Sequence, residues 1–130
     1  MATIKQFEDL EIWKLAREIC QDVYDLCITT PLGSDYKLRD QINGSSGSIM
    51  DNIAEGFERD GKKEFRQFLS IAKGSCGETR SQLYRVFDRK YINQEKFEEI
   101  KEKTIISNKK ISSFISYLNK SEYVGTKYKK

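Results

Sequence analysis

The stretch that decides the fold of this chain is residues 45–59, SSGSIMDNIAEGFER. Two columns of residues spaced seven apart pass through it, Leu38/Ser45/Asn52 and Ile42/Ile49/Gly56. This spacing predicts one continuous helix, although Asn43-Gly44 is typical of a turn and each interior glycine costs a helix about 1 kcal/mol. Because small residues let two backbones come together, the glycines and serines predict a close approach to a neighbouring helix.

Apolar residues recur at helical spacing in four segments, residues 7–29, 35–58, 62–90 and 94–121. Thr29-Thr30-Pro31-Leu32-Gly33 should end the first helix, since the residue before a proline avoids the helical region. Short connections force neighbouring helices to run antiparallel. The predicted fold is all-α, an antiparallel up-down-up-down four-helix bundle in one domain over residues 1–121. We expect the basic tail, residues 122–130, to be disordered.

The composition argues against several classes of protein. The 130 residues include no histidine, which removes the commonest general base and the commonest zinc ligand. We therefore predict no enzymatic activity and no cofactor, although a site built on glutamate or lysine alone stays open. The three cysteines, Cys20, Cys27 and Cys76, show no C-x-x-C spacing and are expected to be buried free thiols. The chain shows no signal peptide and no run of about 18 apolar residues, so we expect a soluble, cytoplasmic protein without membrane contact.

Polar residues at helical spacing form one candidate site. Asn52, Glu55 and Arg59 share a face of the second predicted helix, and Ser75 and Glu78, with Gln82, share a face of the third. A recognition pocket is one interpretation. We favour a structural network that fixes helix register, with Asn52 buried and hydrogen-bonded. A metal site on Glu55 and Glu78 is disfavoured because the usual Glu-x-x-His pairs of bundle metal sites need histidine.

Basic residues form the second candidate site. Residues 1–65 carry 8 Lys and Arg against 13 Asp and Glu, whereas residues 66–130 carry 15 against 7. A basic half suits a polyanion, or the acidic half of another copy. The candidate nucleic-acid ligands are Lys73, Arg80, Arg85, Arg89, Lys90, Lys109, Lys110, Lys127, Lys129 and Lys130. For any one lysine, a solvated helix face or a disordered tail is the favoured explanation of the charge.

Four segments of the chain resemble the 23S ribosomal RNA intervening-sequence protein family. They are Phe7-Glu8-Asp9-Leu10-Glu11-Ile12-Trp13-Lys14-Leu15-Ala16, Leu38-Arg39-Asp40-Gln41-Ile42, Ser48-Ile49 with Asn52-Ile53-Ala54-Glu55-Gly56-Phe57 and Arg59, and Phe68-Leu69-Ser70-Ile71-Ala72-Lys73-Gly74-Ser75 with Glu78 and Thr79. They occur in order over residues 7–93. The resemblance implies a four-helix bundle that assembles into a ring, generally a pentamer, in a bacterial protein without enzymatic activity or cofactor.

Two functions follow as hypotheses. The first is a homo-oligomer, a pentamer by the resemblance, that binds structured RNA or another nucleic acid through its basic surface. The alternative is an adaptor ring that recruits a protein partner such as a reverse transcriptase, as related accessory variability proteins do. Aromatic residues off the main apolar columns are the candidates for contact between subunits, namely Tyr24, Phe57, Phe87 and Tyr91.

Overall fold

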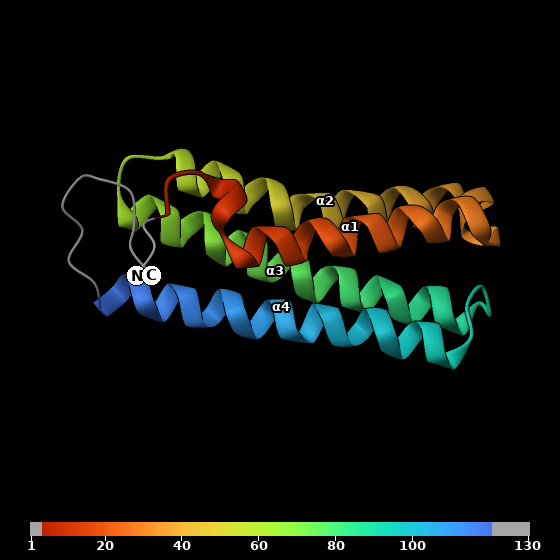
Figure 1. The fold of residues 1–130 in the computed structure, drawn as a ribbon. Coiled ribbons are helices and arrows are strands. Elements are labelled where there is room, and N and C mark those ends of the chain that lie inside the picture. Colours follow the sequence, from red (N-terminus) through yellow and green to blue (C-terminus); the bar gives the residue numbers. More distant parts are fainter. Residues whose placement is uncertain (1–3, 121–130) are drawn as a thin grey trace.

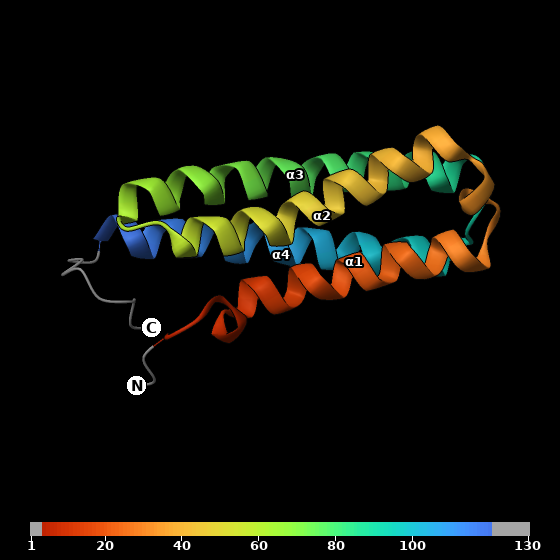
Figure 2. The ribbon, with the colours of Figure 1, turned by 90° about the horizontal axis from the view of Figure 1, so that it is seen from above.

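Four long helices form the part of the chain that the computed structural model describes, residues 4–120 (Figure 1). They are α1 (Glu11–Thr29), α2 (Tyr36–Glu58), α3 (Lys62–Asp88) and α4 (Gln94–Lys120), and two short 3-10 helices, η1 (Phe7–Asp9) and η2 (Pro31–Ser34), flank α1. Successive long helices run antiparallel along a common axis, with α1 and α2 in one layer and α3 and α4 in the other (Figure 2). The predicted all-α, up-down-up-down four-helix bundle is confirmed.

The first helix begins later than its apolar pattern indicates. Leu10 has an extended backbone and a fully buried side chain, and it separates η1 from α1. The Asp9 carboxylate accepts hydrogen bonds from the backbone N–H groups of Lys5 and Gln6 at 3.1 and 3.2 Å, which holds this turn. Because η1 turns away from the axis, α1 starts at Glu11 rather than at residue 7 and does not extend alongside the end of α4 (Figure 1).

The second helix runs unbroken through Asn43-Gly44, as the heptad columns predict. The prediction that its glycines allow a close approach to a neighbouring helix is wrong at Gly44 and Gly47. A Cβ atom placed on Gly44 or Gly47 would meet no atom within 4 Å, so both face open space. The close approach is at Gly56, where a Cβ would lie 2.7 Å from Phe68 Cβ and 2.9 Å from Phe65 Cδ1.

A layer of buried hydroxyl groups divides the core at mid-bundle. One apolar cluster surrounds Ile53 and Phe65 towards the start of α1, and a second surrounds Val23 and Leu83 towards its end. Between them lie buried Ser45, Ser46, Thr79, Thr104 and Ser107. Among the described residues the Ser107 hydroxyl has no hydrogen-bond partner, and the others bond to backbone carbonyls or to one another.

The last two helices meet at a tight connection. The third helix ends at Asp88, two residues before the expected boundary, because Lys90 takes a left-handed backbone with φ of 63°. The fourth begins at Gln94, and the Asn93 side chain caps it by accepting a hydrogen bond from the Lys96 backbone N–H at 2.8 Å. It is described to Lys120, so residue 121 and the predicted tail lie outside the described residues.

The three cysteines are free thiols, and burial raises the pKa of each. Cys76 is buried, whereas Cys20 and Cys27 are half-buried on the side of α1 that faces α2. The Cys20 thiol donates to the Ser46 carbonyl at 3.1 Å, and the Cys76 thiol donates to the Thr104 carbonyl at 3.0 Å. All three therefore serve packing, and none is poised as a thiolate.

Candidate nucleic-acid interface

A row of cations follows the seam between α3 and α4. Arg66, Lys73 and Arg80 are seven residues apart, so they lie in one column at intervals of about 10.5 Å along α3. Arg66 donates to Asn119 Oδ1 of α4 at 2.6 Å, and Arg80 is near enough to Cys76 to oppose the rise in the pKa of that thiol. The sequence-based list missed Arg66, although its heptad spacing from Lys73 and Arg80 was available as a signal.

The part of α4 that lies beside Arg66 and Lys73 is free of negative charge. Residues 103–120 contain four lysines and no aspartate or glutamate. Lys109 is exposed, and the side chain of its neighbour Asn108 donates to the Lys73 carbonyl at 3.5 Å, which puts this part of α4 beside the middle of the α3 row. We name Arg66, Lys73, Arg80 and Lys109 the basic seam. Within the described residues, no ion pair engages Lys73 or Lys109.

Two of the predicted arginines belong to a different edge of the bundle. Arg85 donates to Gln41 Oε1 of α2 at 2.9 Å. Arg89 forms an ion pair with Asp35, and the Tyr91 hydroxyl donates to the same carboxylate at 2.9 Å. The hydrogen bond from Tyr91 is the largest cause that holds the pKa of Asp35 below its usual range; desolvation opposes it, and the hydrogen bond and charge of Arg89 add to the lowering. Both arginines therefore tie α3 to the start of α2, and neither lies in the basic seam.

The remaining basic candidates are spread over other surfaces. Lys90 is exposed in the connection between α3 and α4. Lys110 faces α1, where its ammonium lies 2.5 Å from Glu11 Oε1. Lys127, Lys129 and Lys130 lie outside the described residues.

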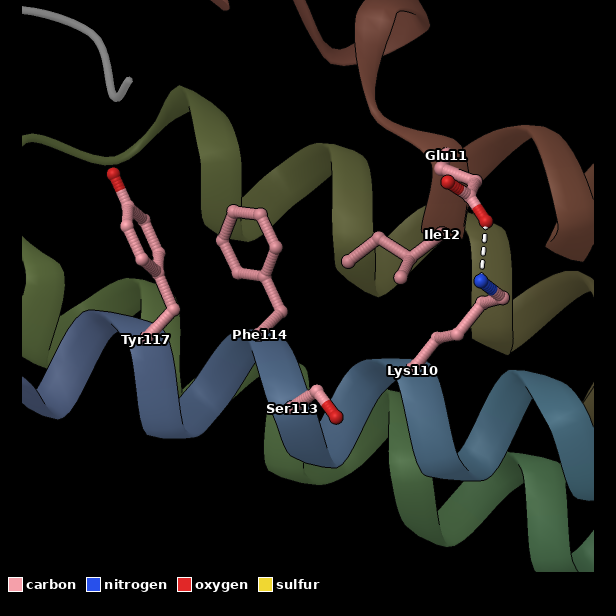
Figure 3. A pocket seen from close by; sticks show the side chains of 6 residues that line it. All are labelled: Glu11, Ile12, Lys110, Ser113, Phe114 and Tyr117. Atoms are coloured by element: carbon pink, nitrogen blue, oxygen red, sulfur yellow. Dashed lines mark ion pairs between the residues drawn. The ribbon is translucent and has the colours of Figure 1, made fainter. Parts of the chain in front are cut away.

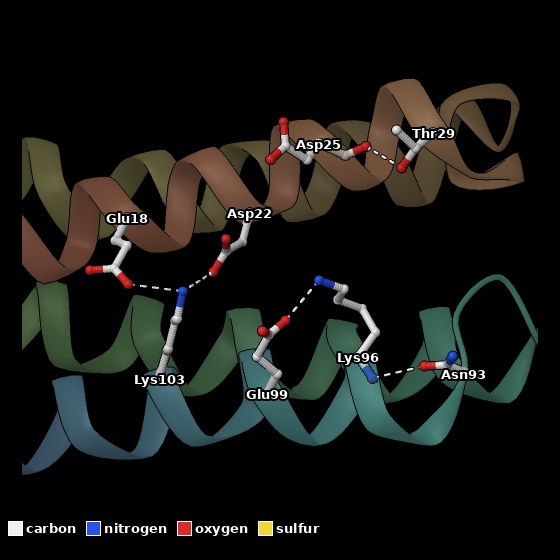
Figure 4. Close-up of polar contacts among 8 residues, drawn as sticks. All are labelled: Glu18, Asp22, Asp25, Thr29, Asn93, Lys96, Glu99 and Lys103. Carbon is white, nitrogen blue, oxygen red and sulfur yellow. Dashed lines mark hydrogen bonds and ion pairs between the residues drawn. The ribbon is translucent and has the colours of Figure 1, made fainter.

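Ion pairs join α1 to α4 along their seam (Figure 4). The Lys103 ammonium lies 2.9 Å from Glu18 Oε1 and 2.8 Å from Asp22 Oδ2. Partial burial opposes its charged form, but the bonds to Asp22 and Glu18 outweigh that effect and raise the pKa of Lys103. Lys96 pairs with Glu99 one turn away on α4 at 2.7 Å. The pairs of Lys103 neutralise Glu18 and Asp22 of α1, on the side of α4 that faces α1.

The polar candidates of α2 and α3 divide into two groups. Asn52 is half-buried and donates to the Ser48 carbonyl and hydroxyl, both at 2.8 Å, and Ser75 donates to the Ser48 hydroxyl at 2.8 Å. This chain crosses from α2 to α3, as a network that fixes register would.

The other three members lie apart from this network. Glu55, Arg59 and Glu78 are exposed, and Arg59 pairs with Glu55 at 3.0 Å and with Glu64 at 3.8 Å. Pairs as exposed as these contribute about 0–1 kcal/mol.

The α2–α3 network extends to buried residues that are not among the predicted site residues. The Ser45 hydroxyl donates to Gln82 Oε1 at 2.6 Å and accepts from Thr79 at 2.9 Å. Gln82 shares a predicted helix face with Ser75, whereas Ser45 follows Leu38 by seven residues and Thr79 follows Ala72 by seven. A hydroxyl in line with apolar residues was the signal that the two helices are joined there by hydrogen bonds.

A hollow opens between α1 and α4 where α1 begins (Figure 3). It has a volume of about 350 Å³ and is lined by Glu11, Ile12, Lys110, Ser113, Phe114 and Tyr117. In Figure 3, Ile12 from α1 and Phe114 from α4 approach each other across it, and the Glu11–Lys110 ion pair closes one end. We call this feature the α1–α4 hollow.

Within residues 4–120, no group of three or more His, Cys, Asp or Glu side chains could hold a metal ion. Among the described helices, none is long and apolar enough to cross a membrane.

The fold and the site define a class, an antiparallel four-helix bundle with hydrogen-bonded α2 and α3 and a basic seam between α3 and α4. Over residues 8–113 the sequence matches the family described as 23S rRNA-intervening sequence protein, and the chain belongs to that family.

A solved structure agrees with this assignment. It is the crystal structure of a protein of unknown function from the S23 ribosomal protein family of Bacteroides thetaiotaomicron VPI-5482. The two chains are 26% identical and superpose with a TM-score of 0.72, and the alignment covers 80% of this chain and 97% of that chain. The comparison with curated proteins gives no match.

Proposed function

We propose that this protein is a non-enzymatic, homo-oligomeric bundle that binds structured RNA through its basic seam. The observation that carries the proposal is the row Arg66–Lys73–Arg80, whose first two members lie beside residues 108–119 of α4, a stretch without a carboxylate. A straight row of cations attracts a phosphodiester backbone, and binding gains free energy from the counterions it releases. The family description, which names the 23S rRNA, makes RNA the first ligand to test.

Assembly into a ring, with five subunits as the resemblance implies, would raise the affinity of this interaction. Each subunit would add one copy of the basic seam, and linked copies bind a long polyanion more tightly than one copy does. Support for self-association comes from the α1–α2 layer, where Tyr24, Ile28 and Tyr36 are 60%, 62% and 65% exposed. Aromatic side chains are enriched at protein interfaces. Of the aromatic candidates for subunit contact, Phe57 is buried in the core and is not accessible to another subunit. Phe87 and Tyr91 pack against the core.

The adaptor function is the second candidate, and the same exposed side chains favour it. Tyr24, Ile28 and Tyr36 could contact a protein partner such as a reverse transcriptase instead of a second copy. Under this hypothesis the basic seam would hold the nucleic acid on which the partner acts.

The test is a titration of a labelled RNA hairpin and a matching DNA duplex at two salt concentrations, with the assembly sized by light scattering. We expect affinity that falls steeply with salt, and the double variant Lys73→Glu/Lys109→Glu should bind at least tenfold more weakly at low salt. The salt slope of this variant should fall by about 2, since each lost phosphate contact removes a little under 1.

The matched control is Lys5→Glu/Lys37→Glu, which changes net charge equally at exposed lysines outside the seam. Equal losses in the two double variants would show a general charge effect and would count against the seam. Arg85 and Arg89 are unsuitable for this test, because replacing them also removes contacts to α2. Binding to neither nucleic acid at low salt would refute the proposal.

A further inference from the structure

The α1–α4 hollow is built like a small ligand site. Ile12 and Phe114 are 4% and 7% exposed and form its apolar floor, and Tyr117 stands at its edge with the ring 5.5 Å from that of Phe114. Figure 3 shows that the side chains of Phe114 and Tyr117 project from α4 on the side where α1 has not yet begun. A volume of about 350 Å³ falls within the range of pockets that hold small organic groups.

Polar groups occupy one end of the hollow. The Glu11 carboxylate and the Lys110 ammonium lie 2.5 Å apart, and their side chains are 57% and 44% exposed. An ion pair this exposed contributes little to stability, so it can rearrange at small cost. Lys110 supplies donors, Glu11 supplies acceptors and the Ser113 hydroxyl supplies both, which suits a ligand with a mixed hydrogen-bonding edge.

The charge around the hollow selects an anionic ligand. Lys109 is next to Lys110 in sequence, and Lys120 follows Tyr117 by one turn of helix. On α4, the exposed Lys109 lies between Asn108, which bonds to Lys73 of α3, and Lys110, which faces α1 at the hollow. A polyanion on the basic seam could therefore reach the hollow by passing over Lys109.

We propose that the α1–α4 hollow receives an unpaired nucleobase of the nucleic acid that binds the basic seam. The base would stack on Tyr117 above Ile12 and Phe114, its polar edge would meet Lys110, Glu11 and Ser113, and the flanking phosphates would lie by Lys109. Bases in single-stranded loops are commonly bound in this way, by aromatic stacking with hydrogen bonds to the base edge. The inference rests on the proposed function and narrows its ligand to RNA with unpaired bases.

The experiment fills the hollow without removing a core side chain. In the variant Ser113→Trp an indole would occupy the space, and Ser116→Trp is the matched control on an exposed position of α4 that does not line the hollow. A second pair separates stacking from hydrogen bonding, since Tyr117→Phe keeps the aromatic face and Tyr117→Ala removes it. Melting temperatures by circular dichroism establish that each variant is folded.

Two RNA probes of equal length are used, a hairpin with 2-aminopurine in its loop and a blunt duplex without unpaired bases. For the hairpin we expect the affinity to fall about tenfold in Ser113→Trp and Tyr117→Ala, which is the lower part of the range for one stacked base. Ser116→Trp and Tyr117→Phe should bind as the parent protein does. Binding should quench the 2-aminopurine fluorescence in the parent protein and not in Ser113→Trp, and the duplex should bind all variants equally.

The outcomes separate this inference from the proposed function. If Lys73→Glu/Lys109→Glu weakens the hairpin while Ser113→Trp and Tyr117→Ala leave its affinity unchanged, the inference is wrong and the basic seam stands. If the duplex and the hairpin lose affinity equally in Ser113→Trp, base insertion is also wrong. If the parent protein binds neither probe at low salt, both the inference and the proposed function fail.

Discussion

Two glycines on the open face of α2 should be replaceable by alanine with a gain in stability. Gly44 and Gly47 lie inside a continuous helix, and a Cβ on either would meet no atom within 4 Å. Glycine is less favourable than alanine in a helix interior by about 0.8–1 kcal/mol, so the double variant Gly44→Ala/Gly47→Ala should gain about 2 kcal/mol. With an unfolding entropy near 2.1 cal/mol/K per residue, the midpoint of a 130-residue chain should rise by about 7 °C.

The control substitution, Gly56→Ala, should lower the stability instead of raising it. At Gly56 an added Cβ would lie 2.7 Å from Phe68 Cβ and 2.9 Å from Phe65 Cδ1, so Gly56→Ala must displace packed side chains. Overpacking of this kind costs about 1–3 kcal/mol and should lower the midpoint by several degrees. Thermal unfolding followed by circular dichroism, at one protein concentration and with the particle size measured by light scattering, tests both variants.

The measurements on Gly44→Ala/Gly47→Ala also test whether another subunit packs against this face of α2. A lower midpoint with unchanged particle size would refute the reasoning from open space, because nothing within the subunit would then account for the loss. A smaller particle would mean that another subunit packs against this face and that the two glycines leave the space for it.

Two further predictions concern charged groups. In Lys103→Met the carboxylates of Glu18 and Asp22 lose the ammonium that lies between them, so the free energy of unfolding from urea titration should fall by about 1–2 kcal/mol, and by less in 1 M salt. An unchanged urea midpoint in low salt would contradict this. The pKa of Asp35 is held below its ordinary 3.8, first by Tyr91 and then by Arg89, so its contribution is present above about pH 4 and is lost as the pH falls through the folded-state pKa. Asp35→Asn should therefore be less stable than the parent at pH 7 and should lose less stability between pH 7 and pH 3; parallel losses would rule out this assignment.

Heptad spacing was sufficient to predict the four helices, even against local turn signals. The helix continues through Asn43-Gly44 because Ile42, Ile49 and Ile53 are all fully buried, and burial of side chains this large outweighs the cost of two glycines. The same columns were less informative at the start of α1. There Leu10 is buried from an extended backbone, which a search for helical spacing does not distinguish from a helical position.

The candidate sites were predictable only in part, since charge composition does not reveal partners distant in sequence. The pairing of Arg89 with Asp35 spans 54 residues. Whether a cation of α3 contacts α2 or lies on the α3–α4 seam depends on the rotation of α3 about its axis. That rotation could have been read from the seven-residue spacing of Arg66, Lys73 and Arg80.

The α2–α3 and α1–α4 seams are held by different interactions, and the difference predicts which helix separates first from the bundle. The α2–α3 seam contains buried hydrogen bonds such as Ser45–Gln82, whereas the α1–α4 seam is joined by the solvent-accessible pairs of Lys103 and Lys110. Salt screens such accessible pairs and leaves buried hydrogen bonds almost unaffected. The backbone amides of α1 should therefore exchange with deuterium through a partial opening that leaves α2 and α3 folded, and rising ionic strength should speed exchange in that one helix first.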